Sequence, residues 1–504
     1  MNIVYEGNGN GHGAINLDSK PQSKIIPVPT TVLPSVMKES GISFLSPEAT
    51  RLRGTLVRMT RHRVFFELYT PDVKLRLSEV LSEFKIIFQE QPVYFGRAVV
   101  CNLVDEGTSI ICEATLEEAD WKNLPSAALL QQDSPLAEGF KIFLQDWQKL
   151  FKVSSEFKVV VADMQTLLYD LRLWLDQIEL GIQALPKDKQ APATQKITEE
   201  AGRLFVPVFD ALHEKLELIS ATIGEDLRPA HRVFVQRQLH ALMLCSPFGY
   251  RAYAKPLGYA GDYEMVNMIA LDPYQGGSLF AKIVNFWFLS QWPSKAHRNR
   301  LTYLQSQLEN ETLRRERQGG KTRIFNFACG PALEIQRFLA EFRLSKNAEL
   351  TLADFSQETL EQLSLKIGKI KEQTGRAPAI QFQRKNIVQV LKEGLKKKTP
   401  RPEYDLVYCA GLFDYLSDST CRQLMEVFYS WLAPDGLLLV TNVVDDRPFR
   451  HMLEFVLDWN LIYRDTEQAR NLFPNVIPLE ARSIKKDPTG VNIFIEARKL
   501  REQH

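Results

Sequence analysis

The sequence has no long apolar run, no closely spaced cysteine pair and almost no net charge. Without about 20 consecutive apolar residues it predicts no membrane-spanning helix. Its six cysteines are scattered and no histidine cluster accompanies them, so neither a zinc site nor a disulfide framework is expected. A net charge of +1 gives no electrostatic basis for binding nucleic acid or an anionic membrane.

The first residues also lack the basic-then-apolar pattern of a secretory signal, so we expect a cytoplasmic protein. The chain has 504 residues, of which 45% are hydrophobic and 24% charged. That length predicts several globular domains. Residues 1–40 are rich in glycine, asparagine and proline, which predicts a flexible lead-in with little to bury.

Residues 41–125 alternate between apolar and polar side chains, as in Thr55, Val57 and Met59, with turn residues between the runs. Period-two alternation predicts a small antiparallel β-barrel. The region resembles PilZ-type barrels, a family that binds cyclic di-GMP, although its two arginine- and serine-containing binding motifs are absent here. Two interpretations stay open. One is a structural or docking barrel, and the other is an anion patch formed by Arg51, Arg53, Arg58, Arg61 and Arg63.

Residues 135–300 are predicted to be helical. Apolar residues recur at spacings of three and four before Pro186, which ends the stripe: Val161, Met164, Leu168, Leu171, Leu175, Ile178, Ile182 and Leu185. The stripe fits either a homodimer seam or an intramolecular helix bundle, and the neighbouring helical segments favour the bundle. A second apolar face is expected at Leu204, Val208, Leu212, Leu216, Ile219 and Ile223.

Strands and helices alternate from residue 301 to 504, and the strands are continuously apolar. Strands are expected at 323–327, 349–353, 405–409 and 436–441, with helices at 332–342 and 357–371. This pattern predicts a doubly wound, Rossmann-like sheet covered on both faces. The expected fold class is therefore multidomain α/β, with a small N-terminal β-barrel, a central helical bundle and a C-terminal doubly wound sheet.

The loop after the first of these strands carries small residues, Ala328-Cys329-Gly330-Pro331-Ala332. Small residues let the backbone approach a ligand, and the following helix offers free amides. Asp354 and Phe355 follow the second strand, 24 and 25 residues after Gly330. A carboxylate at that place can accept hydrogen bonds from a ribose diol. The same logic serves a nicotinamide cofactor or S-adenosylmethionine (SAM).

Later segments favour SAM. The loop resembles the glycine-rich loop of class I SAM-dependent methyltransferases, with Asn326 where that family has an acidic residue. The resemblance implies that the end of the third strand, with Asn386 and Ile387, contacts adenine. The fourth-strand motif contains Ala410 and Gly411, and a Pro-Asp-Gly turn precedes the fifth strand. This resemblance implies SAM as the cofactor. An amide at Asn326 supplies no charge, so another residue is expected to help hold the ammonium end of SAM.

A second signature, residues 253–265, combines glycines, tyrosines and carboxylates. It is either a turn packed onto the sheet domain or a lid over the cofactor. As a lid it would bring Asp262 or Glu264 to the SAM ammonium and line the pocket with Tyr259 and Tyr263. Such a lid would compensate for the uncharged Asn326.

Together these segments resemble the bacterial family of 3-hydroxypalmitic acid methyl ester (extracellular factor) biosynthesis. The resemblance covers roughly residues 230–500 and rests on 255–265, 329–334, 411–416 and 458–464. It implies O-methylation of a fatty-acid carboxylate to a methyl ester. The N-terminal barrel and the long helices depart from that family, and so does the absence of histidine in 443–448, near whose start one is expected.

A carboxylate acceptor is ionised at neutral pH and needs no strong base, so alignment and desolvation dominate the catalysis. Arg450 and Tyr463, with Arg447 and Arg464, follow the central strands and are candidates for orienting the acid. His451 would be a base if the acceptor were a hydroxyl. The aromatic run Phe280, Phe286, Trp287, Phe288 and Trp292 is either core or an acyl channel.

The sequence thus predicts a small-molecule carboxylic acid partner, no nucleic acid, and no stable membrane insertion. The alternatives are a methyltransferase for another small-molecule acceptor, or a catalytically silent SAM-binding signalling protein. The predicted catalytic residues are Tyr259, Tyr263, Arg450 and Tyr463. The predicted cofactor contacts are Asp262, Glu264, Ala328, Cys329, Gly330, Pro331, Asp354, Phe355, Asn386, Ile387, Ala410 and Gly411, and no metal is expected.

Overall fold

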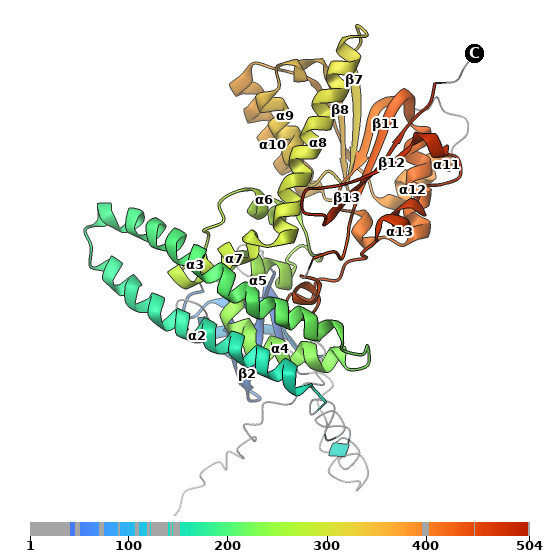
Figure 1. Cartoon of the computed structure of the whole chain (residues 1–504). Coiled ribbons are helices and arrows are strands. Elements are labelled where there is room, and N and C mark those ends of the chain that lie inside the picture. Colours follow the sequence, from blue (N-terminus) through green and yellow to red (C-terminus); the bar gives the residue numbers. More distant parts are fainter. Residues whose placement is uncertain are drawn as a thin grey trace, which may run out of the picture.

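The computed structural model describes residues 41–45, 51–69, 75–88, 91–105, 110–117, 121, 140–141, 144, 152–395, 403–447 and 449–501. The expected lead-in at 1–40 lies outside this part of the chain. Figure 1 shows a barrel, a helical region and a sheet flanked by helices, which confirms the predicted fold class.

The N-terminal barrel is closed, and its six strands pair in the order β1-β2-β3-β6-β5-β4. Their bounds are β1 Gly41–Leu45, β2 Arg51–Met59, β3 Arg63–Leu68, β4 Val80–Phe88, β5 Gln91–Asp105 and β6 Ile110–Leu116. Phe44, Phe66 and Phe84 fill the interior, because alternate residues of each strand point inward. In the arginine group, Arg51 pairs with Glu83 and Arg63 with Glu113, which neutralises two of the five cations proposed for an anion patch.

The helical region packs as an intramolecular bundle. Its helices are α2 Ser155–Gln183, α3 Lys187–Ala221, α4 Arg228–Met243, α5 Pro247–Ala254, α6 Tyr263–Ala270 and α7 Leu279–Ser290. The stripe on α2 is buried against the other helices at Val161, Met164, Leu168, Leu175 and Ile182, so the seam considered for a homodimer is used within the chain. Pro186 is the N-cap of α3, so α2 has ended before it.

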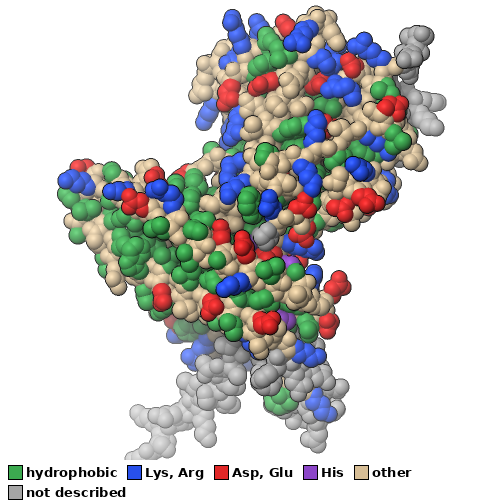
Figure 2. Space-filling view, viewed as in Figure 1, with side chains coloured by type: hydrophobic (Ala, Val, Ile, Leu, Met, Phe, Trp, Pro, Cys, Tyr) green, Lys and Arg blue, Asp and Glu red, His purple; other side chains and the backbone are tan. Residues whose placement is uncertain are grey.

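The predicted apolar face of α3 is partly wrong. Leu204 and Val208 are 75% and 53% exposed, whereas Phe205, Phe209 and Leu216 are buried. The two phenylalanines bury more area than the aliphatic residues beside them, so the helix turns them inward. Figure 2 shows apolar side chains on the outer surface of the helical region. The aromatic run at 280–288 is core: Phe280, Trp287 and Phe288 are fully buried, as expected by default.

The C-terminal domain is built on a seven-stranded sheet of order β12-β13-β11-β10-β7-β8-β9. Its strands are β7 Thr322–Phe327, β8 Ala348–Asp354, β9 Ala379–Arg384, β10 Tyr404–Cys409, β11 Leu432–Val443, β12 Arg482–Lys486 and β13 Asn492–Arg498. Strands β7 to β11 are parallel, while β13 runs antiparallel between β11 and β12. This insertion of the last strand distinguishes the sheet from the all-parallel order of dinucleotide-binding folds.

Helices cover both faces of this sheet. Helices α8 Trp292–Glu316, α9 Leu333–Glu341 and α10 Gln357–Thr374 pack on one face. Helices α11 Ile387–Leu395, α12 Asp418–Ser430 and α13 Thr466–Arg470 lie on the other. The carboxyl ends of the parallel strands point toward the helical region (Figure 1). Helix α8 runs unbroken through the domain boundary expected at residue 300.

In the part of the chain that the structure describes, no helix combines the length and hydropathy needed to cross a membrane. The same residues contain no group of three or more histidine, cysteine or acidic side chains placed to hold a metal ion.

Candidate active site

The loop from Ala328 to Ala332 joins β7 to α9 in a conformation that suits glycine. Ala328, Gly330 and Ala332 have φ angles of 53°, 52° and 45°. An L-residue in this left-handed region costs roughly 1 kcal/mol or more, so the two alanines are strained. A Cβ built on Gly330 meets no atom within 4 Å. The α-carbon of Gly330 therefore borders open space at the sheet edge, where a ligand can approach the backbone.

Asp354 ends β8 and ties this loop to the next one. Its Oδ2 accepts a hydrogen bond from the Gly330 amide at 3.0 Å, and its Oδ1 accepts one from the Ser356 amide at 2.9 Å. Burial raises the pKa of the carboxyl, and the bonds from the amides oppose that rise. Each oxygen of a carboxylate can accept a second hydrogen bond. Asp354 therefore keeps acceptor capacity for a ribose diol.

Asn326 lies in a buried polar cluster with Glu334 and Tyr408. Its Nδ2 donates to Glu334 Oε1 at 3.2 Å and to Tyr408 Oη at 2.9 Å, and Tyr408 donates to the same Oε1 at 2.7 Å. Burial raises the pKa of Glu334, and the Tyr408 hydrogen bond opposes that rise. The carboxyl group beside Asn326 is thus Glu334, on α9, a residue that the sequence analysis did not assign to the cofactor.

The two carboxylates predicted to compensate for Asn326 have partners of their own. Asp262 is buried, forms a salt bridge with Arg251 at 2.8 Å and caps α6 through the amides of Glu264 and Met265. Glu264 accepts a hydrogen bond from Asn267 at 2.8 Å. The structure therefore gives Asp262 a structural role at the start of α6, and its role toward the cofactor stays a prediction.

The segment from Tyr259 to Tyr263 lies over the carboxyl edge of the sheet. The Tyr259 ring packs edge-on against Phe355 at 5.4 Å, and Tyr263 donates to Glu358 Oε1 at 2.9 Å. The Tyr415 hydroxyl, from the loop after β10, donates to the Ala260 carbonyl at 3.2 Å. These contacts reach residues that follow both β8 and β10. The segment therefore packs onto the loops that follow both strands, and its role as a lid over the cofactor stays a prediction.

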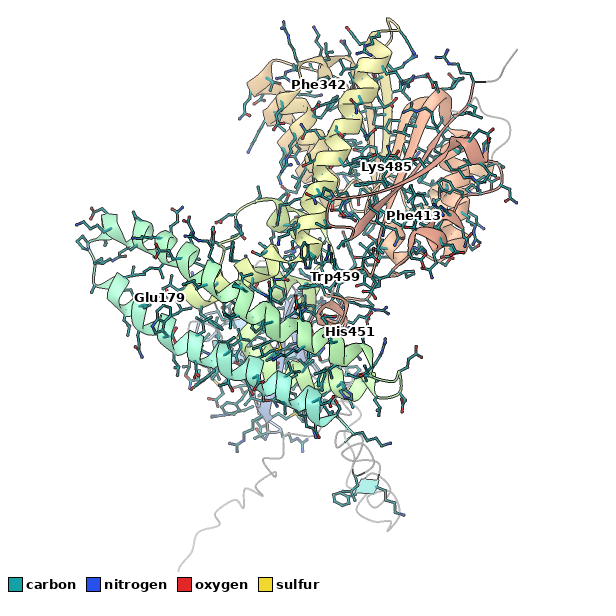
Figure 3. The ribbon with its side chains drawn as sticks, viewed as in Figure 1. Glu179, Phe342, Phe413, His451, Trp459 and Lys485 are labelled. Atoms are coloured by element: carbon teal, nitrogen blue, oxygen red, sulfur yellow. The ribbon has the colours of Figure 1, made fainter. Side chains whose placement is uncertain are left out.

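The neighbouring part of the signature 253–265 also contacts the segment after β11. Lys255 Nζ donates to the Asp458 carbonyl at 2.6 Å, and Arg232 forms a salt bridge with the Asp458 carboxylate at 2.9 Å. The neighbouring Trp459, labelled in Figure 3, donates to Tyr415 at 2.9 Å. A Cβ built on Gly261, whose φ is +76°, would come within 3.1 Å of the Trp459 ring. A side chain at position 261 would clash with the Trp459 ring, and the positive φ also favours glycine, so the close packing of this turn on Trp459 requires Gly261.

The remaining predicted cofactor contacts also lie at the carboxyl edge. Asn386 and Gln389 exchange hydrogen bonds of 2.9 and 3.0 Å at the start of α11, which leaves Asn386 Nδ2 free for another partner. Ala410 and Gly411 follow β10, and the Gly411 amide donates to Thr441 at 2.9 Å. Cys329 in the first loop is buried, which raises the pKa of its thiol well above its usual value.

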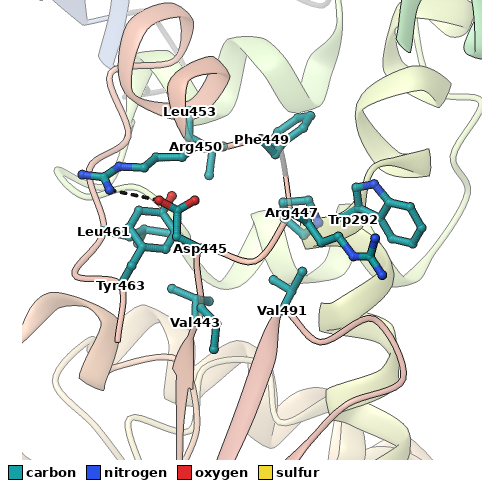
Figure 4. A pocket seen from close by; sticks show the side chains of 12 residues that line it. Trp292, Val443, Asp445, Arg447, Phe449, Arg450, Leu453, Leu461, Tyr463 and Val491 are labelled. Carbon is teal, nitrogen blue, oxygen red and sulfur yellow. Dashed lines mark hydrogen bonds and ion pairs between the residues drawn. The ribbon is translucent and has the colours of Figure 1, made fainter. Parts of the chain in front are cut away.

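Arg450 and Tyr463 line a pocket at the carboxyl end of β11 (Figure 4). Arg450 is held by Asp445 at 3.0 Å and Glu454 at 2.7 Å, and its guanidinium lies 5.1 Å from the centre of the Tyr463 ring. The Tyr463 hydroxyl is buried without a hydrogen-bond partner in the described chain. Most other lining residues are apolar: Trp292, Pro293, Val443, Val444, Phe449, Leu453, Leu461 and Val491. Arg447, stacked on Trp292 at 4.8 Å, and Asp445 complete the lining.

His451 and Arg464 do not line this pocket. His451 Nδ1 bonds the Glu217 carboxylate of α3 at 2.8 Å, and this carboxylate also accepts hydrogen bonds from the backbone amides of His451 and Met452. Burial alone would raise the pKa of Glu217, but hydrogen bonds from His213 and His451 outweigh it and lower that pKa to about 2. Arg464 is buried among the Phe413 carbonyl, the Leu416 carbonyl and Asp418. Both residues have structural roles.

Comparison with known proteins agrees with this arrangement. Residues 325–438 match the family model of a methyltransferase domain. This match spans β7 to β11, including the strained loop and Asp354. The C-terminal domain therefore has the SAM-binding fold of a SAM-dependent methyltransferase, and the match leaves the acceptor undetermined. No curated protein matches the chain.

Similar solved structures share only low identity with the chain. One, described as a possible exported protein from Bordetella parapertussis, has 16% identity, covers 63% of this chain and 100% of its own, and has a TM-score of 0.39. Magnesium protoporphyrin IX methyltransferase from Synechocystis PCC 6803 with bound SAH has 12% identity, covers 42% and 87%, and has a TM-score of 0.30. The N-methyltransferase NodS from Bradyrhizobium japonicum WM9 in complex with SAH has 15% identity, covers 47% and 98%, and has a TM-score of 0.28. These values carry no argument about substrate.

Proposed function

We propose that this protein is a SAM-dependent O-methyltransferase that converts the carboxyl group of a fatty acid or 3-hydroxy fatty acid to its methyl ester. One observation carries the proposal. The segments 255–265 and 458–464, which bear the resemblance to the 3-hydroxypalmitic acid methyl ester family, lie against each other over the cofactor edge. The contacts of Lys255 with Asp458 and of Gly261 with Trp459 join them.

The residues of the sheet edge suit the cofactor. Asp354 offers acceptors for the ribose, and the open side of Gly330 admits the adenosine to the backbone. The Asn386 amide stands at the start of α11, where it can reach the adenine. When bound, SAM supplies an electrophilic methyl group on a sulfonium. The chain's residues then have to hold the acceptor oxygen about 3 Å from that carbon and in line with the bond that breaks.

The pocket beside β11 supports a carboxylate acceptor with an apolar tail. Its walls are largely apolar, which suits the carbon atoms that adjoin an acceptor carboxylate. The unpartnered Tyr463 hydroxyl can donate to the carboxylate. Its ion pairs hold Arg450 in place, and the Arg450 guanidinium in turn packs against the ring of Tyr463. The described residues that line the pocket include no histidine, their one carboxylate, Asp445, is paired with Arg450, and His451 is bound to Glu217. A carboxylate needs no general base, whereas an amine or hydroxyl acceptor would require one.

The proposal is tested with methyl-labelled SAM and a panel of free and 3-hydroxy fatty acids of increasing chain length. The purified full chain should produce labelled, base-labile esters. Asp354→Ala should abolish both the label and the calorimetric binding of SAM. Label in an amine or hydroxyl acceptor and in none of the acids would contradict the carboxyl assignment. Unchanged SAM affinity in Asp354→Ala would contradict the ribose assignment.

A further inference from the structure

Helix α8 brings an arginine to the cofactor edge that the methyltransferase family match does not include. Arg300 lies on α8, outside residues 325–438. A Cβ built on Gly411 would lie 3.2 Å from each terminal nitrogen of the Arg300 guanidinium. Gly411 has a φ of +83° and belongs to the loop after β10. The guanidinium therefore rests directly on one of the backbone segments predicted to contact the cofactor.

Arg300 lacks a direct anionic partner. Within the described part of the chain, its guanidinium forms no hydrogen bond or ion pair. Burial lowers its pKa, and the acidic groups Asp414 and Glu334 are near enough to oppose that change. Asp414 is occupied by the Val443 amide at 2.8 Å, and Glu334 by Asn326 and Tyr408. The Arg300 side chain is partly buried, and a partly desolvated cation without a bonded anion favours the binding of an anionic ligand.

The charges around Arg300 match an α-amino acid. The guanidinium offers a planar fork that binds a carboxylate with two parallel hydrogen bonds. Glu334 offers a carboxylate next to the strained loop, in a cluster that already contains the amide of Asn326. One positive and one negative group thus lie near each other, between the loops after β7 and β10. The amino-acid end of SAM carries the complementary pair, a carboxylate and an ammonium.

We infer that Arg300 binds the carboxylate of the methionine moiety of SAM, with Glu334 beside the ammonium. The inference rests on the proposed cofactor site and adds to it the residues that read the zwitterionic end of the ligand. It also explains how a chain with Asn326 in place of an acidic residue holds this end. The positive charge comes from α8 and the negative charge from α9, on either side of the loop.

The test compares two probes that differ only in the amino-acid moiety. S-adenosylhomocysteine (SAH) carries it, and 5′-methylthioadenosine lacks it. Calorimetry on the full chain should show that the wild-type protein binds SAH more tightly. Arg300→Met should weaken SAH binding at least tenfold and change 5′-methylthioadenosine binding less than twofold, since only SAH carries the carboxylate that the guanidinium would bind. Arg300→Lys, which keeps the charge and loses the fork, should fall between them.

Arg317→Met is the matched control, because Arg317 is exposed at the far end of the same helix. It should leave both affinities unchanged. Equal weakening of both probes in Arg300→Met would show a structural effect and overturn the inference, as would an unchanged SAH affinity. If the wild type binds 5′-methylthioadenosine and SAH equally, the cofactor site stands and the role of Arg300 fails. If it binds neither, the proposed cofactor site itself fails.

Discussion

The Gly330 amide donates to the Asp354 carboxylate at 3.0 Å, and this bond joins the loops that follow the first two strands of the sheet. The bond fixes the α-carbon of Gly330 toward open space. A methyl group added there would clash only with a ligand. A single substitution can therefore disturb the binding of cofactor without disturbing the packing of the fold.

We predict that Gly330→Ala folds but loses SAM affinity by more than tenfold. The new methyl group occupies the space where the ligand approaches, while the protein itself offers it no clash. Gly375→Ala is the matched control, since Gly375 also has positive φ and open space around a Cβ but caps α10. Thermal melts should show similar losses of roughly 1 kcal/mol for both variants. Equal SAM affinities in the two would place the cofactor elsewhere.

Tyr463→Phe should lower methyl transfer without lowering stability. The Tyr463 hydroxyl is buried and unpartnered, so its removal relieves a desolvation penalty of about 1–3 kcal/mol. If that hydroxyl orients a carboxylate acceptor, kcat/KM should fall about tenfold or more while SAM affinity stays constant. Tyr169→Phe, on the exposed face of α2, should change neither quantity. A Tyr463→Phe variant with full activity would remove this residue from the acceptor site.

Glu217 should make the protein sensitive to acid. Its pKa is lowered to about 2 in the folded state, against about 4.5 for an ordinary glutamate. Its contribution is therefore complete above pH 4.5 and is lost as the pH falls toward 2, an amount on the order of 3 kcal/mol. Glu217→Gln should lower the free energy of unfolding at pH 7. It should also reduce the loss of stability that occurs as the pH falls from 4.5 toward 2. Denaturant titrations at several pH values measure both effects.

Glu214→Gln is the control for that experiment, because Glu214 is exposed on the same helix. Glu214→Gln should show the same loss of stability at low pH as the wild type. If Glu217→Gln loses as much stability at low pH as the wild type, the contact between α3 and the 449–457 segment does not set the pH dependence of stability.

Asp414 should act in the opposite direction. Burial raises its pKa to about 6, and Arg300 and the Val443 amide oppose that rise. The folded state therefore holds the proton more tightly than the unfolded state, so stability should fall as the pH rises from about 4 to 6. Asp414→Asn keeps an oxygen for the Val443 amide and should remove this fall. Parallel denaturant titrations of wild type and variant between pH 4 and 7 provide the measurement, and identical slopes would contradict the raised pKa.

The sheet was predictable because each of its parallel strands is a short apolar run bounded by turn residues. The runs at 323–327, 349–353, 405–409 and 436–441 all fall in observed strands. The pair β12 and β13 was not predicted, since its residues include Lys485, Lys486 and Glu496, which interrupt the apolar pattern. Glu496 is buried under Tyr303 and Lys485, contacts that no local pattern shows.

The candidate site was predictable where it follows strand ends and hidden where it depends on helix packing. Gly330, Asp354 and Gly411 could be assigned to the proposed site because the carboxyl edge of a parallel sheet collects loop residues. Arg300, which we infer to belong to the cofactor site, was not predicted because it stands among the polar residues of a helix, where an arginine usually faces solvent. Its position follows from the packing of α8 across β7 and β10, and the sequence gives no local signal for that packing.

Helix α8 also sets a spacing. Trp292, at its first turn, forms a wall of the pocket beside β11, and Arg300 lies eight residues further along. An α-helix rises 1.5 Å per residue, so about 12 Å of rigid helix separates the two. One rigid helix therefore carries both a wall of the acceptor pocket and Arg300. A single-residue insertion between them would rotate one relative to the other by about 100°. Helix α8 thus fixes the separation between the acceptor and SAM in the proposed reaction.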